Sequence, residues 1–351
     1  MTNVQRQHDE WLHSGLVEEA LDPCLRIVDP HHHLWYKLGA RPHVATYMID
    51  ELSRDIERSG HNIIATVYMQ SSSAKWRRAG GPEDLRVLGE SELMQGVAMQ
   101  GESGLYGQTR VCAGIIATAN LLLGSEVEPV LRAHQAVARN FRGVRFLGGR
   151  AEQIPFSNPK LVEAAQVLAS LGLDLDVNGP EMHPLDFTGV LGGIAGLAEA
   201  VPSLTIILDH CGGAIGPTCL EERPASLMDW RDGIRKLAAC PNVVVKLGGL
   251  HMPVNGFALG PEQRPSPISS EELAELLLPT YQFVIDAFGA QRCMFESNFP
   301  VDKWGVSYGV LWNTFKRVAD TLGLSKLDRE AIFQGTAVRI YRLELPADSG
   351  D

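Results

Sequence analysis

Eight short apolar segments rich in β-branched residues recur along the chain, and each is followed by a longer stretch with helical character. These segments are Arg26–His33, Ile63–Gln70, Val111–Ala117, Phe141–Leu147, Leu173–Asn178, Leu204–His210, Asn242–Gly249 and Arg292–Phe299. Nearly continuous apolar strands are typical of a parallel sheet that is covered on both faces. The repeated alternation of strand and helix therefore predicts a (β/α)8 barrel of the TIM type, with a doubly wound sheet as the alternative.

The stretches between the segments carry helix-start signals and one loop-like region. Ser269 with Glu272 three residues later forms a capping box, which predicts a helix that begins at this point. The Pro- and Gly-rich stretch Pro253–Pro267 is long enough to be an active-site loop after the seventh strand. No linker divides the chain. We therefore predict an N-terminal extension (1–25), a single catalytic barrel (26–345) and a C-terminal tail (346–351).

Composition limits the classes of partner. The 351 residues include 42 acidic and 31 basic side chains, so the formal net charge is −11. An acidic chain lacks the basic footprint that nucleic acids and anionic membranes attract, so we expect a small-molecule partner. The polar N-terminus resembles no secretory signal, and the six cysteines form no CxxC pair, which favours reduced thiols in a cytoplasmic protein. Whether the chain forms a homo-oligomer is left open.

Polar residues stand at the ends of most predicted strands. They are His31, His33, Gln70, Arg145, Asp176, Asn178, His210, Lys246, Glu296 and Asn298. In a TIM barrel the chemistry lies where strands end and the following loops begin. Burying such groups without partners is costly, so a strand end that merely packs has no need of them. Their recurrence predicts a functional site at the barrel mouth.

Period-two alternation predicts which side chains point into the barrel. We expect Asp29, His31 and His33 on one face of the first strand, and His32 on the other. Two neighbouring imidazoles suit a divalent metal or a substrate carboxylate, although a hydrogen-bonded core histidine is the simpler alternative. On the sixth strand the same rule puts His210 inward and Asp209 outward.

An inward-facing cation on the seventh strand needs a compensating charge. We expect Lys246 to pair with Glu296 or with a neighbouring acid, and a structural ion pair is as good an interpretation as a substrate contact. Arg142 and Arg145 lie on opposite faces of the fourth strand, so at most one can reach the mouth. An arginine there would suit a carboxylate-bearing ligand through its planar pair of donors.

Several motifs, taken in order, resemble one enzyme family. The opening IVDPHHHLW is similar to the D-x-H-x-H-x-W start of the amidohydrolase superfamily, and in particular of its lactonase branch. The segments FRGVRFL, IILDHCGG, PNVVVKLGGL, RCMFESNFPVD and FQGTAVRIYRL resemble later elements of that branch in the same order. Each segment alone is a weak signal, whereas the ordered set is specific.

The resemblance implies a (β/α)8 barrel that opens a small lactone through attack by an activated water. It implies that His31, His33 and His210 are catalytic, and that they are the ligands if a divalent metal such as zinc is bound. It further implies that Arg145 contacts a substrate carboxylate. Many relatives carry another histidine on the fifth strand, where this chain offers Asp176, Asn178 or, a few residues later, His183.

The eighth strand departs from the family pattern. Asn298 stands where the family has the aspartate that acts as base or metal ligand, and an amide cannot take a proton from water near neutral pH. Glu296, two residues earlier on the same face, and Asp302 in the following loop are the candidate replacements. Loss of an anionic ligand weakens a divalent site. We therefore expect catalysis that needs no metal or is only weakly assisted by one.

Three functional hypotheses follow. The leading one is a hydrolase of a small carboxylated lactone or cyclic ester, with Lys246 and Asn298 among the groups that contact the substrate. The second is a metal-dependent non-oxidative decarboxylase of the same superfamily, which the loss of the aspartate disfavours. The third is a barrel that has lost catalysis and serves as a binding protein; the retained His31, His33, Arg145 and His210 argue against it.

Overall fold

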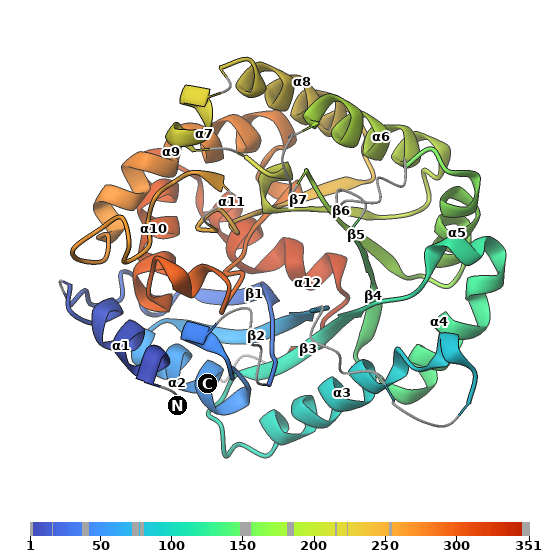
Figure 1. Cartoon of the computed structure of the whole chain (residues 1–351), viewed down its shortest axis with the longest axis horizontal. Coiled ribbons are helices and arrows are strands. Elements are labelled where there is room, and N and C mark those ends of the chain that lie inside the picture. Colours follow the sequence, from blue (N-terminus) through green and yellow to red (C-terminus); the bar gives the residue numbers. More distant parts are fainter. Residues whose placement is uncertain are drawn as a thin grey trace.

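Eight parallel strands form one sheet that curls into a barrel (Figure 1). The computed structural model describes residues 3–15, 17–36, 42–71, 77, 81–147, 156–180, 186–214, 216–222, 224–252 and 255–345. The strands are β1 (Arg26–His32), β2 (Asn62–Met69), β3 (Arg110–Ala117), β4 (Phe141–Phe146), β5 (Asp174–Asn178), β6 (Ile206–Asp209), β7 (Val243–Leu247) and β8 (Cys293–Phe295). They follow one another around the sheet in chain order, which confirms the TIM-type barrel and excludes the doubly wound alternative.

The last and first strands meet through a short contact that nearly closes the barrel. His32 pairs with Phe299 in a parallel bridge, and the Asn298 amide donates to the His31 carbonyl oxygen at 2.8 Å. The eighth strand is shorter than expected, because regular pairing stops at Phe295 and Asn298 adopts a left-handed conformation with φ of 53°. The chain leaves the strand just where its polar side chains reach the mouth.

The helices are α1 (Asn3–Leu12), α2 (Ile49–Ser59), α3 (Leu88–Glu102), α4 (Glu128–Val137), α5 (Pro159–Ser170), α6 (Phe187–Ala200), α7 (Pro217–Glu222), α8 (Ser226–Ala238), α9 (Ser270–Phe288), α10 (Tyr308–Thr321), α11 (Lys326–Glu330) and α12 (Thr336–Ile340). Most of them surround the barrel as an outer layer, whereas α12 lies across the barrel in this view (Figure 1). The predicted helix start is confirmed, since α9 begins after Ser269, whose side chain accepts a hydrogen bond from the Glu272 backbone amide; the Glu272 carboxylate pairs with Arg264 instead of completing the capping box. Within the described ranges, no helix has both the length and the apolar character needed to cross a membrane.

Two apolar layers hold the fold together. A smaller cluster brings strand residues such as Val28, Val67 and Val244 together with Tyr341 and Leu343 from the C-terminal segment. The larger cluster lies between the strands and the surrounding helices. The C-terminal segment is tied to the beginnings of strands, because Arg342 forms an ion pair with Asp174 at the first residue of β5. Buried apolar residues thus fix one end of the barrel and leave polar chemistry to the other.

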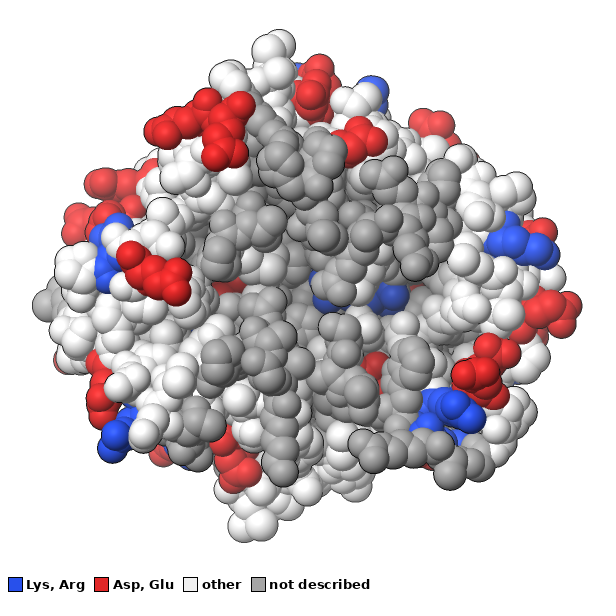
Figure 2. Space-filling model, viewed as in Figure 1, with Lys and Arg blue, Asp and Glu red and all other residues white. Residues whose placement is uncertain are grey.

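Surface charge agrees with the acidic composition. On the face shown in Figure 2, acidic side chains are spread around the rim, and the basic side chains form no continuous patch among the coloured residues. This pattern gives no support to a nucleic-acid interface on the described part of this face. All six cysteines lie in described segments and are free thiols, as expected.

Buried His134 of α4 makes stability sensitive to acid. Its ring contacts Ser91 Oγ at 2.7 Å and the Thr118 carbonyl oxygen at 3.1 Å, and burial lowers its pKa to about 4. Below its ordinary pKa of about 6.5, the unfolded chain binds a proton that the folded chain excludes. We expect this group to reduce the free energy of unfolding by roughly 3 kcal/mol between pH 6.5 and 4.

The His134→Gln variant keeps a hydrogen-bonding side chain but has no titration in this range. Urea unfolding of both proteins at pH 7, 5.5 and 4.5 measures the difference in free energy of unfolding, in which the other titrating groups cancel. The wild type should lose stability more steeply. Parallel pH curves for the two proteins would contradict the assignment.

Candidate active site

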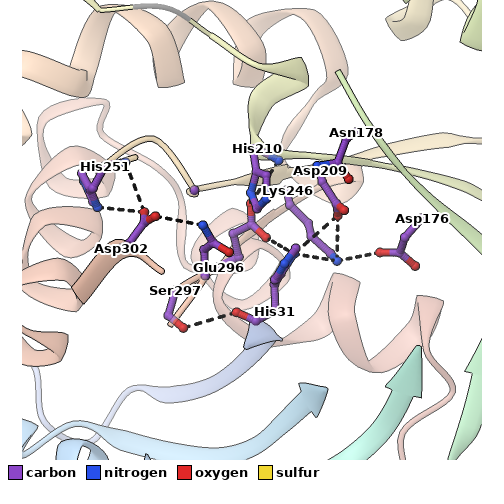
Figure 3. A network of polar contacts seen from close by, with 12 residues as sticks. His31, Asp176, Asn178, Asp209, His210, Lys246, His251, Glu296, Ser297 and Asp302 are labelled. Atoms are coloured by element: carbon purple, nitrogen blue, oxygen red, sulfur yellow. Dashed lines mark hydrogen bonds and ion pairs between the residues drawn. The ribbon is translucent and has the colours of Figure 1, made fainter. Parts of the chain in front are cut away.

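Charged and imidazole side chains from several strands converge at the barrel mouth (Figure 3). The group includes His31, His33, Asp176, Asn178, Asp209, His210, Lys246 and Glu296, and each is at least nine-tenths buried. A buried charge is tolerated only when it is paired and hydrogen-bonded. The contacts within this group therefore determine which protonation states the site can hold.

Two histidines at the end of β1, His31 within it and His33 just after it, face each other through the same ring nitrogen. The Nε2 atoms of His31 and His33 are 3.2 Å apart. His33 Nδ1 lies 2.9 Å from the Met69 carbonyl oxygen, and His31 Nδ1 lies 2.7 Å from Glu296 Oε2. These oxygens only accept, and Glu296 Oε2 is closer to His31 Nδ1 than Lys246 Nζ is, at 3.3 Å. We therefore assign the proton of each ring to Nδ1, and the neutral rings direct two Nε2 lone pairs toward the same place.

Burial keeps both rings neutral. It lowers the pKa of His33 well below 6.5, and it lowers the pKa of His31 despite the nearby Glu296 carboxylate. His32 points elsewhere, with its Nε2 2.8 Å from Thr66 Oγ1, as alternation predicted. The same rule was wrong for Asp29, whose carboxylate accepts hydrogen bonds from Ser297 and Tyr308. A register shift between Asp29 and His32 breaks the alternation.

The histidine pair fits a divalent metal in part. Two nitrogen ligands at about 2.05 Å from a tetrahedral zinc are about 3.3 Å apart, close to the observed separation of the Nε2 atoms. Asn298 offers no anionic ligand, and its Nδ2 donates to Asp302 Oδ1 at 2.8 Å. Ligand atoms of His31, Asp209 and His210 also lie within 4.8 Å of one another. The Asp209 oxygens, however, already form ion pairs with Lys246 and Arg145. The histidines are therefore better metal ligands than Asp209.

Glu296 holds two histidines in place. Its Oε1 lies 2.7 Å from His210 Nδ1 and accepts the His210 amide at 3.1 Å, while Oε2 faces His31. Burial alone would raise the pKa of Glu296, but His210 and His31 outweigh it and bring the pKa below its ordinary value. A carboxylate with a lowered pKa is a weak base. The geometry therefore favours an orienting role for Glu296 over the expected role as base.

His210 gains basicity from this contact. Burial opposes the charged ring, but the Glu296 carboxylate outweighs burial and raises the pKa of His210 above 6.5. Because Nδ1 faces Glu296, Nε2 carries the lone pair in the neutral ring. His210 is also strained, since its φ is 54°, and such backbone strain clusters at functional sites.

Two glycines make room for the pair of side chains. A Cβ atom on Gly249, whose φ is 68°, would lie 1.8 Å from His210 Nδ1. A Cβ atom on Gly248 would lie 2.2 Å from the Glu296 carbonyl oxygen. The absence of both side chains lets His210 and Glu296 pack against the end of β7.

Lys246 lies at the centre of a second set of ion pairs. Its Nζ is 2.6 Å from Asp176 Oδ1 and 3.0 Å from Asp209 Oδ1, so a neighbouring acid provides the expected partner rather than Glu296. Burial raises the pKa of Asp176 to about 7 even though Lys246 opposes it. Burial would raise the pKa of Asp209, but Lys246, His31 and Arg145 together outweigh it and hold the pKa well below its usual range.

Asp209 is the main residue that the sequence reasoning misplaced. The expected outward orientation is wrong, because its Oδ2 also lies 3.1 Å from Arg145 Nε. Ile207, two residues before Asp209, packs in the smaller cluster with the other inward-facing strand residues, whereas Ile206 and Leu208 belong to the larger cluster outside the strands. Asp209 therefore faces into the barrel, and the left-handed His210 turns toward the mouth as well. The expected alternation took Ile206 and Leu208 as the inward face, which put Asp209 on the wrong side.

Arg145 is engaged with protein groups. Its Nε donates to Asn178 Oδ1 at 2.8 Å and contacts Asp209, whereas Arg142 points to the Tyr341 carbonyl oxygen. The prediction that at most one of the two arginines reaches the mouth is confirmed. An ion pair with Asp209 neutralises the charge that a substrate carboxylate would need.

Of the remaining candidates, Asp302 lies beside the site. Asp302 is buried and lies between Asn298 and His251, whose Nδ1 is 2.9 Å from Asp302 Oδ2. His251 was not among the candidates; it follows β7 in a loop, where no periodicity marks it. His183 lies outside the described residues.

The need for space between Gly249 and the His210 ring can be tested by substitution. The Gly249→Ala variant should displace His210 from Glu296 and reduce the free energy of unfolding by about 2–4 kcal/mol, since steric overlap adds to strain at positive φ. The control is Gly323→Ala, whose φ is 62° with open space around the new methyl group, and it should cost only about 1 kcal/mol. Urea unfolding and the imidazole N–H signals in the NMR spectrum measure both effects. Equal losses in the two variants would show that His210 does not depend on Gly249.

The contact between Asn298 and Asp302 predicts how a second carboxylate would behave. In the Asn298→Asp variant two carboxylates would meet at hydrogen-bond distance, which raises the pKa of one above its unfolded value of about 4. The destabilisation should therefore be small at pH 4 and should grow to about 2–4 kcal/mol by pH 8. Asn158→Asp adds the same charge at the N-cap of α5 and should not destabilise. A pH-independent difference between Asn298→Asp and the wild type would contradict the contact.

Comparison with known proteins agrees with this fold. The family model described as amidohydrolase matches residues 28–343. An L-fucono-1,5-lactonase of Burkholderia ambifaria is 25% identical over 339 residues, which cover 92% of this chain and 97% of the relative.

Two solved structures share the fold at lower identity. An amidohydrolase from Burkholderia multivorans with bound zinc has a TM-score of 0.67 and 23% identity, over 91% of this chain and all of that chain. The 5-carboxyvanillate decarboxylase LigW of Sphingomonas paucimobilis has a TM-score of 0.59 and 11% identity, with the same coverage. The barrel, its mouth of paired histidines and carboxylates, and the match over most of its length show that the chain belongs to the amidohydrolase family.

Proposed function

We propose that this amidohydrolase opens a small hydroxylated lactone by attack of an activated water on the ring carbonyl. The observation that carries the proposal is the His210–Glu296 pair beside the facing Nε2 atoms of His31 and His33. An imidazole oriented by a carboxylate is a suitable general base near neutral pH. The similarity to an L-fucono-1,5-lactonase supports the same reaction class.

In this proposal His210 acts on the water. Its Nδ1–H remains hydrogen-bonded to Glu296, and its Nε2 takes a proton from the water as the oxygen attacks the carbonyl carbon. Glu296 is then a positioning residue, which fixes the ring and stabilises the imidazolium that forms. Lys246, Asp176 and Asp209 keep the surrounding charges balanced without taking part in the transfer.

His31 and His33 act on the carbonyl side. Their Nε2 atoms would hold a divalent ion such as zinc, and the chemistry that such an ion supplies is Lewis-acid polarisation of the carbonyl oxygen. Glu296 contacts Nδ1 of His31 and the Met69 carbonyl oxygen contacts Nδ1 of His33. These contacts orient the two rings so that both Nε2 atoms are available as ligands.

The expected carboxylated substrate fits these contacts less well than a hydroxylated one. Arg145 already pairs with Asp209, so a substrate carboxylate would have to compete with a buried protein carboxylate. The Nδ2 atom of Asn178 is buried and has no hydrogen-bond partner among the described residues. An unsatisfied donor next to Arg145 suits a ring hydroxyl oxygen.

A substrate panel tests the proposal. Aldono-1,5-lactones, aldono-1,4-lactones and 2-pyrone-4,6-dicarboxylate are screened with a pH indicator after chelation and again with zinc or manganese. We expect an aldonolactone to exceed the dicarboxylate in kcat/KM by at least about tenfold, because unsatisfied hydrogen-bonding groups discriminate strongly. Hydrolysis of none of the lactones, with release of CO2 from carboxylated phenols, would favour the decarboxylase alternative.

Variants then assign the roles within the site. His210→Asn should lower kcat by at least about a hundredfold, the scale of a lost general base. His32→Gln is the matched control, because His32 is equally buried but faces Thr66 rather than the mouth. Equal losses in the two variants would remove His210 from the mechanism.

A further inference from the structure

His251 forms a second buried pair with a carboxylate, apart from His210 and Glu296. It is 2% exposed and stands four residues after the end of β7. Its Nδ1 lies 2.9 Å from Asp302 Oδ2, and its backbone amide donates to the same oxygen at 3.3 Å. Figure 3 shows His251 and Asp302 to one side of Glu296, with His210, Asp209 and Lys246 on the other.

The ring of His251 has room for a ligand at Nε2. Both ring nitrogens are buried without a well-aligned hydrogen bond from the described residues, but Nδ1 lies at ion-pair distance from Asp302, whereas Nε2 has no such contact. A buried polar atom without a partner costs free energy, so such an atom in a folded protein calls for a ligand or a mechanistic reason. Because Asp302 Oδ2 faces Nδ1 at 2.9 Å, the nitrogen left for a ligand is Nε2.

Two short connections place His251 next to the proposed site. Gly249, two residues before it, lies directly against the His210 ring. Two residues span at most about 7 Å, so the backbone of His251 is near the proposed base. On the other side, Asp302 accepts a hydrogen bond from the side-chain amide of Asn298. The backbone N–H of Asn298 in turn donates to the His31 carbonyl oxygen.

The contacts of Asp302 also suggest a structural role for Asn298. Its Nδ2 donates to Asp302 Oδ1, which leaves Oδ2 for His251. An aspartate at position 298 would repel Asp302 instead. The amide that replaces the family aspartate thus serves to orient Asp302 toward His251.

We propose that His251 is the general acid that protonates the departing ring oxygen, with Asp302 and Asn298 as positioning residues. This inference rests on the proposed lactone hydrolysis. Water adds to the carbonyl carbon and gives one proton to His210 Nε2. The bond between the acyl carbon and the ring oxygen breaks, and that oxygen takes the proton from His251 Nε2–H and leaves as the alcohol. The acid product loses its proton to solvent, and the proton on His210 returns to His251 through water.

The dependence on the leaving group provides the test. Protonation matters most for an aliphatic alkoxide and little for a phenoxide, because general acid catalysis follows the basicity of the departing oxygen. In the metal-replete protein, kcat/KM is measured for the best aldonolactone of the panel and for dihydrocoumarin, whose leaving group is a phenol. His251→Gln should lower kcat/KM at least about a hundredfold for the aldonolactone and less than about fivefold for dihydrocoumarin. Asp302→Asn should show the same selectivity to a smaller degree.

Two further measurements keep the outcome decisive. His134→Gln, at a buried histidine held by Ser91 and Thr118, should affect both substrates equally. If His251→Gln fails to fold, or if the wild type does not accept dihydrocoumarin, His251→Ala is assayed on the aldonolactone with added imidazole, and rescue of kcat is expected. Equal losses for both substrates, or no rescue in a folded His251→Ala, would overturn the role of His251 while leaving the lactonase intact. A wild type that hydrolyses no lactone would overturn the proposed function itself, and the role of His251 with it.

Discussion

The arrangement of the mouth depends on one buried carboxylate. Glu296 is fully buried where β8 ends, and an unpaired charge there would cost several kcal/mol. It is compensated by His210 through Oε1 and by His31 through Oε2. These two contacts join the first, sixth and eighth strands at the point where the barrel closes. They also fix which nitrogen of each ring is left for chemistry, so stability and catalysis depend on the same atoms.

Charge balance extends from this carboxylate across the barrel. Asp209 lies between Lys246 and Arg145, and Asp176 completes the coordination of Lys246. With the pKa of Asp176 raised to about 7, this carboxyl can adjust the net charge of the cluster near neutral pH. A network of this kind tolerates small rearrangements of charge but not the removal of one member, since the partner would remain buried and unpaired.

Backbone features at the strand ends make the network fit. His210 and Asn298 both adopt left-handed conformations, and Gly248 and Gly249 have no side chain where His210 and Glu296 need the space. These features let side chains from the ends of β6 and β8 meet across the end of β7. Strain and missing side chains are costs that the apolar layers elsewhere in the barrel offset.

The sequence by itself determined the barrel, its eight strands and most of the residues at the mouth. Those properties depend on local apolar patterning and on the rule that parallel strands end on the same side. Only the tertiary structure decided how the charges pair. Asp209 lies on the inward face of β6 together with Ile207, Glu296 meets His210 rather than Lys246, and His251 joins the group from a loop without periodicity. Pairing depends on distances between residues tens to hundreds of positions apart, and alternation along one strand carries no information about them.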